Sequence, residues 1–267
     1  MYKRRLVAIL FLKNGWIVRS EEFKVHQIIG EPTIHAQRLK EWNVDELILL
    51  DISRNKLKDF GNFRDDYKYK PVKNLLDFLK RFSFQCDMPL TFGGNITKFE
   101  DVKLRIEYGA DKVAINTCFY NNPGEIRKAS QRYGKQAIVA SIDCKLNKNH
   151  EYSVIIEGGN VDTKIDPLDW ALEVEKIGAG EILLQFIDKD GKGDGYNIEM
   201  INKIKNSVNI PIIACSGAGN KRQILECYNA TNVDAVGAGN IFHFTENAYP
   251  LIKSFLLKYR NDIRALD

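Results

Sequence analysis

The sequence lacks the features that would place it in a membrane or in an oxidising compartment. No apolar run approaches transmembrane length, and the N-terminus has no signal-peptide apolar segment. The five cysteines are odd in number and lack metal-ligand spacing. No cluster of histidine, cysteine or carboxylate residues has that spacing either. We therefore predict a cytoplasmic protein with buried, reduced thiols and with no metal or other cofactor.

An excess of either charge is also missing. The chain has 39 lysines and arginines against 35 aspartates and glutamates, a net charge of +4, and the basic residues fall mostly on expected helix faces. This balance is too weak and too dispersed to indicate a nucleic-acid partner, and we predict no membrane partner. Hydrophobic residues make up 44% of the sequence, which is ample for a sizeable core.

Short apolar runs alternate with amphipathic segments along the whole chain. The expected strands are 6–12, 46–51, 89–92, 112–115, 137–143, 181–186, 211–214 and 235–237. The expected helices are 33–42, 72–81, 98–108, 123–133, 167–177, 198–205, 221–228 and 248–258. Strands that are each followed by a helix indicate a parallel sheet. Because no linker rich in proline, glycine or serine divides the 267 residues, we predict a single α/β domain over 1–267, a closed (β/α)₈ TIM barrel. A doubly wound open sheet is the alternative.

The two halves of the chain, about 1–121 and 122–267, repeat each other. Segment 45–51 resembles 180–188, segment 88–94 resembles 210–217, and segment 109–116 resembles 232–240. The repeat supports the barrel and aligns the expected strand 6–12 with the expected strand 137–143. The latter ends on Asp143, at the end of a barrel strand where chemistry is found, whereas Phe11 stands at the matching place in the first half. Asp143 is therefore a candidate functional carboxylate.

Glycine-rich turns follow several of the expected strands. The turns at 93–94 and 216–219 lead into helices, and the pairs Asn116-Thr117 and Gly239-Asn240 follow two other strands. Such turns let backbone N–H groups converge on an anion, and a helix N-terminus adds a favourable dipole. The repeat places two such sites on opposite sides of one barrel mouth, which would suit a substrate with a phosphate at each end. The alternative is that each turn only reverses the chain.

Five passages are more specific, namely 44–52, 109–117, 178–184, 187–191 and 241–244. On these passages the sequence from Arg4 to about Phe244 resembles the HisF family, the cyclase subunit of the lyase imidazole glycerol phosphate synthase. The resemblance implies a (β/α)₈ barrel with a HisH-like glutaminase subunit docked at its N-terminal face. It also implies that ammonia made by this partner passes through the barrel to a bisphosphorylated substrate at the other face.

The resemblance assigns a role to several charged residues. A ring that gates ammonia corresponds to Arg5, Glu46, Lys112 and Glu181, and a glutaminase-contact position corresponds to Asp111. Buried charges of this kind are costly unless they pair with one another. A salt-bridged plug that only stabilises the barrel is therefore the alternative interpretation of the ring.

The resemblance also predicts the substrate face. Asp143 corresponds to a catalytic aspartate of the family. The substrate- and phosphate-binding positions correspond to Arg19, Asp51, Gly94, Asn95, Asn116, Thr117, Asp188, Asp190, Gly191, Gly217, Gly239 and Asn240.

The sequence departs from the family at this face. Phe11 replaces the catalytic aspartate of strand 1, and since a general acid–base step is typically worth about 10²–10⁴-fold, we expect weakened cyclase activity. Asn95 and Ser216 stand where the family usually has glycine, and Arg19 stands where it has lysine. The basic and aromatic segment 53–70 is longer than ordinary loops of about 2–6 residues. It is either a functional loop or a tolerated insertion.

These departures resemble a HisF-like branch associated with surface-polysaccharide, including lipopolysaccharide, biosynthesis, as does segment 12–15. In that branch the glutaminase and the barrel supply ammonia to an amidotransferase that makes acetamidino groups on sugars. We therefore rank an ammonia-conducting subunit for sugar amidination first, with a sugar amidotransferase as a further partner. An imidazole glycerol phosphate synthase cyclase of histidine biosynthesis is second. A scaffold that binds phosphates without turnover is third.

Overall fold

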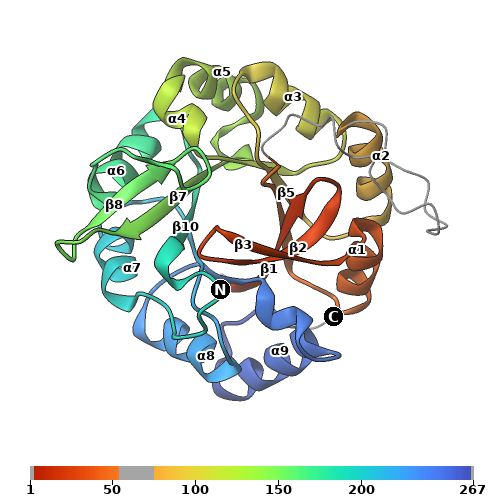
Figure 1. The fold of residues 1–267 in the computed structure, drawn as a ribbon. Coiled ribbons are helices and arrows are strands. Elements are labelled where there is room, and N and C mark those ends of the chain that lie inside the picture. Colours follow the sequence, from red (N-terminus) through yellow and green to blue (C-terminus); the bar gives the residue numbers. More distant parts are fainter. Residues whose placement is uncertain (1–2, 54–74, 266–267) are drawn as a thin grey trace.

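The structure, a computed structural model, describes residues 3–53 and 75–265. Eight parallel strands form its centre: β1 (Arg5–Lys13), β4 (Glu46–Asp51), β5 (Leu90–Gly93), β6 (Lys112–Ile115), β7 (Ile138–Leu146), β10 (Glu181–Phe186), β11 (Ile212–Ala214) and β12 (Ala235–Ala238). Each strand pairs with the next along the chain, and β12 pairs with β1, so the sheet closes into a barrel (Figure 1). The predicted (β/α)₈ barrel is confirmed.

Helices surround the strands on all sides (Figure 1). They are α1 (Pro32–Glu41), α2 (Leu75–Gln85), α3 (Phe99–Glu107), α4 (Thr117–Asn121), α5 (Pro123–Tyr133), α6 (Pro167–Ile177), α7 (Ile198–Lys205), α8 (Lys221–Ala230) and α9 (Ala248–Tyr259), with 3-10 turns η1 (Lys135–Ala137), η2 (Ile187–Lys189) and η3 (Asn240–His243). The predicted strands and helices are present, with ends that differ by a few residues, whereas α4 and the 3-10 turns were not predicted. The start of the helix expected at 72–81, and the long loop expected at 53–70 except Ser53, lie outside the described residues.

Apolar side chains on alternating faces of the strands form two separate cores. On β1, Val7, Ile9 and Phe11 point into the barrel, where they meet the inward side chains of other strands. Leu6 and Leu10 point outward into the larger core beneath the helices. A strand that is buried on both faces must be apolar at nearly every position, which explains the uninterrupted runs in the sequence.

Two antiparallel hairpins extend the barrel strands and were not predicted. After β1 the chain forms β2 (Trp16–Glu21) and β3 (Val25–Gly30), and after β7 it forms β8 (Tyr152–Ile156) and β9 (Val161–Asp162). Asn14 and Gly15, both at positive φ, make the turn into β2. Asn-Gly between apolar strands is the strongest local sequence signal for a hairpin, so this one could have been predicted.

Across residues 3–53 and 75–265, no helix is long and apolar enough to cross a membrane, and no group of three or more histidine, cysteine or acidic residues is placed to hold a metal ion. All five cysteines are free, and four of them are buried. Burial raises the pKa of the Cys215 thiol to about 12. It therefore remains protonated and unreactive at neutral pH.

Candidate active site

Asp143 lies on the inner face of β7, near the C-terminal end of the barrel, and is only 6% exposed. Its Oδ2 accepts a hydrogen bond from Asn116 Nδ2 at 2.7 Å, and its Oδ1 accepts from Gln185 Nε2 at 3.0 Å and from Ser141 Oγ at 3.3 Å. Burial raises the pKa of Asp143 to about 6, although the three donors favour its ionised form. A carboxyl group poised near neutrality can both take and return a proton.

Phe11 lies on the inner face of β1 and is 7% exposed. Its ring meets the ring of Phe23, from the turn between β2 and β3, edge to face at 6.4 Å. It also belongs to the inner apolar core, together with Val18 and Leu50. The position that matches Asp143 in the first half of the chain is therefore part of an apolar wall at the barrel mouth.

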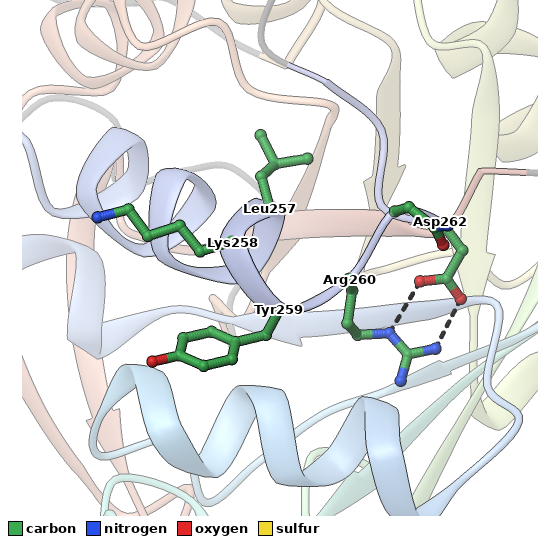
Figure 2. A pocket seen from close by; sticks show the side chains of 6 residues that line it. Leu257, Lys258, Tyr259, Arg260 and Asp262 are labelled. Atoms are coloured by element: carbon green, nitrogen blue, oxygen red, sulfur yellow. Dashed lines mark hydrogen bonds and ion pairs between the residues drawn. The ribbon is translucent and has the colours of Figure 1, made fainter.

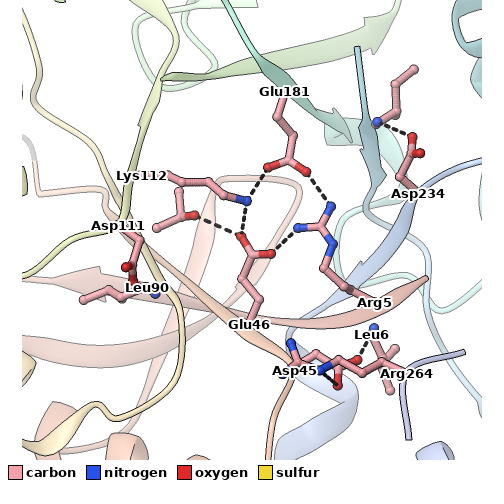
Figure 3. A network of polar contacts seen from close by, with 12 residues as sticks. Arg5, Leu6, Asp45, Glu46, Leu90, Asp111, Lys112, Glu181, Asp234 and Arg264 are labelled. Carbon is pink, nitrogen blue, oxygen red and sulfur yellow. Dashed lines mark hydrogen bonds and ion pairs between the residues drawn. The ribbon is translucent and has the colours of Figure 1, made fainter. Parts of the chain in front are cut away.

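Four charged side chains close the opposite end of the barrel (Figure 3). They are Arg5, Glu46, Lys112 and Glu181, the first residues of β1, β4, β6 and β10. Arg5 pairs with Glu46 and, at 2.5 Å, with Glu181. Lys112 bridges the same two acids at 3.0 and 2.7 Å. Each cation contacts both anions, so the ring predicted as an ammonia gate is a closed circuit of ion pairs.

The environment of this charged ring stabilises its ionised forms. Burial by itself would raise the pKa of Glu46, but the charges of Arg5 and Lys112 hold that pKa below its usual value. Burial likewise opposes the charge of Lys112, yet Glu46 and Glu181 raise its pKa. Thr91 Oγ1 donates a further hydrogen bond to Glu46 at 3.1 Å.

The turn after β5, a predicted phosphate-binding turn, contains two consecutive residues at positive φ, and its side chains bond to neighbouring groups of the protein. Gly94 has φ +93°, and Asn95 keeps φ +53° in place of a glycine. Asn95 Nδ2 donates to Asp51 Oδ2 at 3.0 Å, and the buried Arg105 donates to the Gly94 carbonyl at 2.6 Å. Asp51 and Asn95, both predicted binding residues, therefore hold the loop together.

The matching turn after β11 is equally constrained. Ser216 and Gly217 have φ values of +76° and +97°. A Cβ at Gly217 would lie 2.2 Å from the carbonyl oxygen of Gly195, so only glycine fits there. A Cβ at Gly239, after β12, would lie 2.9 Å from the carbonyl oxygen of Ile9. Both glycines are required by close backbone approach, whether or not they also bind an anion.

Comparisons with known proteins bear on the family of the whole chain. Residues 5–248 match the family described as "Histidine biosynthesis protein". The chain is 35% identical to a protein of Hydrogenobaculum sp., 39% identical to one of Sulfurisphaera tokodaii, and 33% identical to one of Bacillus cereus. Each alignment covers 99% of this chain and 100% of the relative, and each relative is named "Imidazole glycerol phosphate synthase subunit HisF".

The chain belongs to the histidine biosynthesis protein family. Within this family fold, Asp111, the predicted partner contact, lies exposed just before β6 (Figure 3). Its Oδ2 accepts from Leu90 N at 2.8 Å. Asp234 accepts from Ile212 N in the same way at 2.9 Å, in the other half of the barrel. Asp111 therefore caps the start of a strand, and its exposed position also leaves it available to a partner.

Several other predicted binding residues of this family member hold the hairpins. Asp190 accepts from Ser20 Oγ at 2.7 Å, and Asn240 Nδ2 donates to the Ser20 carbonyl at 2.7 Å. Asp188 accepts from the Tyr152 hydroxyl at 3.0 Å. Thr117 Oγ1 accepts a hydrogen bond from the backbone N–H of Glu157. Gly191 lies so close to β2 that a Cβ there would be 2.6 Å from the Ser20 carbonyl oxygen. These residues position the segments above the barrel mouth.

Arg19 lies on β2 between Val18, in the inner core, and Ser20, which bonds Asp190. Side chains alternate along a strand, so Arg19 lies on the face of β2 opposite to Val18 and Ser20. Its guanidinium lies 6.0 Å from the centre of the Phe244 ring, next to η3. The predicted cation of the substrate face is thus near η3, which follows β12.

Sequence reasoning missed two residues of the site, Ser141 and Gln185. Both are buried polar residues within apolar strands, and both bond Asp143. The sequence did contain a signal for Gln185, because it lies within the apolar run Glu181–Phe186 of a buried strand. A buried glutamine is normally hydrogen-bonded, so a polar partner inside the barrel could have been predicted.

Two cavities lie outside this site. One, of about 480 Å³, is at the C-terminal end of α9 and is lined by Leu257, Lys258, Tyr259, Arg260, Asn261 and Asp262. There Arg260 pairs with Asp262 (Figure 2). The other, of about 410 Å³, is lined by residues of α1 and α2. Neither is lined by Asp143 or by the charged ring, and we assign neither a function.

Proposed function

We propose that this protein is the synthase subunit of a glutamine-dependent imidazole glycerol phosphate synthase. It receives ammonia from a HisH-like glutaminase at the N-terminal face and delivers it to a bisphosphorylated substrate at the opposite face. The observation that supports this proposal is the placement of the closed charged ring and of Asp143 at the two ends of one barrel interior. The names of the relatives favour this function over sugar amidination.

The interior between the ring and Asp143 suits neutral ammonia. Most inward side chains there are apolar, including Val7, Ile48, Val139 and Leu183. An apolar passage admits a small neutral molecule, whereas transfer of an ammonium ion into it is strongly unfavourable. The ring adds paired charges at the entrance, so that a conformational change of these ion pairs would be needed for passage.

At the substrate face, Asp143 would act as the general base. With a pKa of about 6 it is mostly ionised at neutral pH, and it can accept a proton from the attacking nitrogen and return it in a later step. Phe11 cannot transfer protons. We therefore expect the acid and base steps to fall on Asp143 alone and the cyclase rate to be lower than that of an enzyme with two carboxylates.

A second function rests on Phe11 itself. An apolar side chain in place of a catalytic carboxylate fits a barrel that conducts ammonia but has lost ring-closing chemistry. Such a subunit would supply an enzyme that amidinates sugars for surface polysaccharides. The two proposals share the ammonia route and differ in whether this chain turns over the phosphorylated substrate.

Turnover of the purified chain separates them. The bisphosphorylated ribulosyl-aminoimidazole substrate of histidine synthesis would be supplied with ammonium salt, and its consumption followed for the wild type, Phe11→Asp and Phe11→Asn. Turnover by the wild type supports the synthase. Activity in Phe11→Asp alone, with the uncharged Phe11→Asn as the matched control, supports ammonia delivery to another enzyme. If none of the three forms consumed the substrate, this compound would not be the substrate under either proposal.

A further inference from the structure

Gln185 is a buried amide at the C-terminal end of the barrel interior. On β10 its neighbour two residues back, Leu183, belongs to the inner apolar core, so Gln185 points to the same side. It is 2% exposed and pairs in register with Asp143 on β7. The family resemblance did not assign it a role.

The hydrogen bonds of Gln185 determine which way its amide faces. Its Nε2 lies 3.0 Å from Asp143 Oδ1 and 3.2 Å from Ser141 Oγ. An ionised carboxylate can only accept, so the amide nitrogen, not the oxygen, must face β7. Since the two ends of a planar amide point in opposite directions, Oε1 is directed away from β7.

The amide oxygen is left without a donor. Within the described ranges 3–53 and 75–265, Gln185 Oε1 is buried and has no hydrogen-bond partner. Buried carbonyl oxygens in proteins are nearly always paired, because an unpaired one loses its hydration without compensation. Glu31 Oε1 is a second such oxygen, but its carboxylate already caps α1 through Oε2. Gln185 Oε1 is thus an acceptor prepared for a donor that arrives within the barrel.

The surroundings restrict the donor to a small, neutral molecule. The inner apolar core on this side contains Leu183 of β10, Ile213 of the next strand, β11, and the protonated Cys215, which directly follows β11. A site this enclosed and apolar excludes a bulky ligand and disfavours a cation. Ammonia has three N–H donors and one lone pair, so it can donate to an amide oxygen and keep the lone pair free for attack.

We propose that Gln185 Oε1 is the hydrogen-bond acceptor that holds neutral ammonia beside Asp143 at the end of the barrel interior. The inference rests on the proposed ammonia route and adds the residue that receives the ammonia. Gln185 Nε2 orients the base, Gln185 Oε1 orients the nucleophile, and no covalent bond to the protein forms.

Steady-state kinetics with ammonium salt test the acceptor role. Gln185→Leu removes the oxygen, and we expect the KM for ammonia to rise about three- to tenfold, the size of one net hydrogen bond, while the KM for the phosphorylated substrate stays unchanged. Ser141→Ala is the matched control, because it also removes a donor to Asp143 but keeps Oε1. An equal rise of the ammonia KM in both variants would overturn the proposal. Gln185→Met repeats the comparison if the branched leucine disturbs folding.

A binding measurement keeps the inference separate from the proposed function. The protein labelled with ¹³C at the glutamine side-chain carbonyls would be titrated with ammonium chloride at alkaline pH, against potassium chloride of equal ionic strength. The Gln185 signal, assigned by its loss in Gln185→Leu, should shift saturably with ammonium only. No such shift overturns the proposal, whereas a shift in a chain without ammonia-dependent turnover supports the site and contradicts the function. Ammonia-dependent turnover with an unchanged ammonia KM in Gln185→Leu would support the proposed function and contradict the ammonia site at Gln185.

Discussion

Two carboxylates inside the same barrel differ in the sign of their pKa shift, and their partners explain the difference. Asp143 is bonded by neutral donors, namely two amides and a hydroxyl, so burial dominates and its pKa rises to about 6. Glu46 lies between Arg5 and Lys112, whose charges outweigh burial and lower its pKa. The protein thus keeps one acid permanently ionised and holds the other near neutrality, where it can exchange protons.

The shift at Asp143 predicts a pH-dependent contribution to stability. Its pKa is about 3.9 in an unfolded chain and about 6 in the fold. Between these values the folded state holds a proton that the unfolded state has lost, so stability is fully present below the unfolded pKa and falls as pH rises through 6. The free energy of unfolding of wild type minus Asp143→Asn should therefore fall by about 3 kcal/mol over this window.

Urea denaturation of both proteins at pH 3.5, 5 and 7.5 measures this difference. Other groups titrate equally in the two proteins and cancel in the subtraction. Parallel stability curves would show that Asp143 ionises in the fold as readily as in the unfolded chain.

At the scale of elements, one short segment holds both hairpins. Asp188, in η2, accepts from Tyr152 on β8, and Asp190, just after it, accepts from Ser20 on β2 and from Phe23 N at 3.3 Å. The hairpins follow equivalent strands of the two half-barrels, so the internal repeat extends to the segments above the mouth. A change in the η2 segment would act on both hairpins together.

Weakening one tie should loosen one hairpin without unfolding the barrel. Ser20→Ala removes the hydrogen bond to the buried Asp190 carboxylate, and because a hydrogen bond to a charged group is worth about 1.5–3 kcal/mol, amide exchange in β2–β3 should speed up about tenfold or more. Hydrogen exchange followed by NMR measures these amide exchange rates residue by residue. Tyr152→Phe is the matched control and should affect β8–β9 instead. If either variant sped up exchange equally in both hairpins, the Ser20–Asp190 and Tyr152–Asp188 hydrogen bonds would not act independently.

The elements were predictable from the sequence to different degrees. The eight barrel strands were recognised because a strand that is buried on both faces, such as β4 (Glu46–Asp51), is a continuous apolar run. The hairpin strand β3 has the pattern of an exposed ribbon and gave no such signal, although Asn14-Gly15 marks the turn from β1 into β2. The bond from Asp190 to Ser20 spans 170 residues. Such ties depend on the closed barrel, so local sequence patterns cannot predict them.

At the scale of the whole molecule, the barrel is closed at one end by paired charges and carries the candidate catalytic carboxylate, Asp143, at the other. The four ring positions were predicted from the family resemblance, but their closure into one circuit follows from the barrel's geometry, which brings β1, β4, β6 and β10 around a common axis. A second buried pair, between Lys253 of α9 and Asp45 just before β4, ties this helix to the same end.

A substitution in the charged ring can separate its structural role from its role as an ammonia gate. Glu46→Gln leaves Arg5 and Lys112 with one anion between them. Removing one partner of a buried ion pair typically costs about 3–5 kcal/mol. The free energy of unfolding measured by urea denaturation should fall by this amount. The surface variant Glu107→Gln, which breaks an exposed pair with Lys103, should cost under about 1 kcal/mol.

The same variant tests conduction when a glutaminase subunit is present. A gate that has lost a charge should lower the glutamine-driven rate more steeply than the rate driven by added ammonium salt, because ammonia from solution does not have to enter through the charged ring. A ring that only stabilises the barrel would lower both rates by the same factor, in line with the loss of folded protein. The ratio of the two rates for Glu46→Gln, normalised to Glu107→Gln, therefore decides whether the ion pairs at the bottom of the barrel are a plug or a gate.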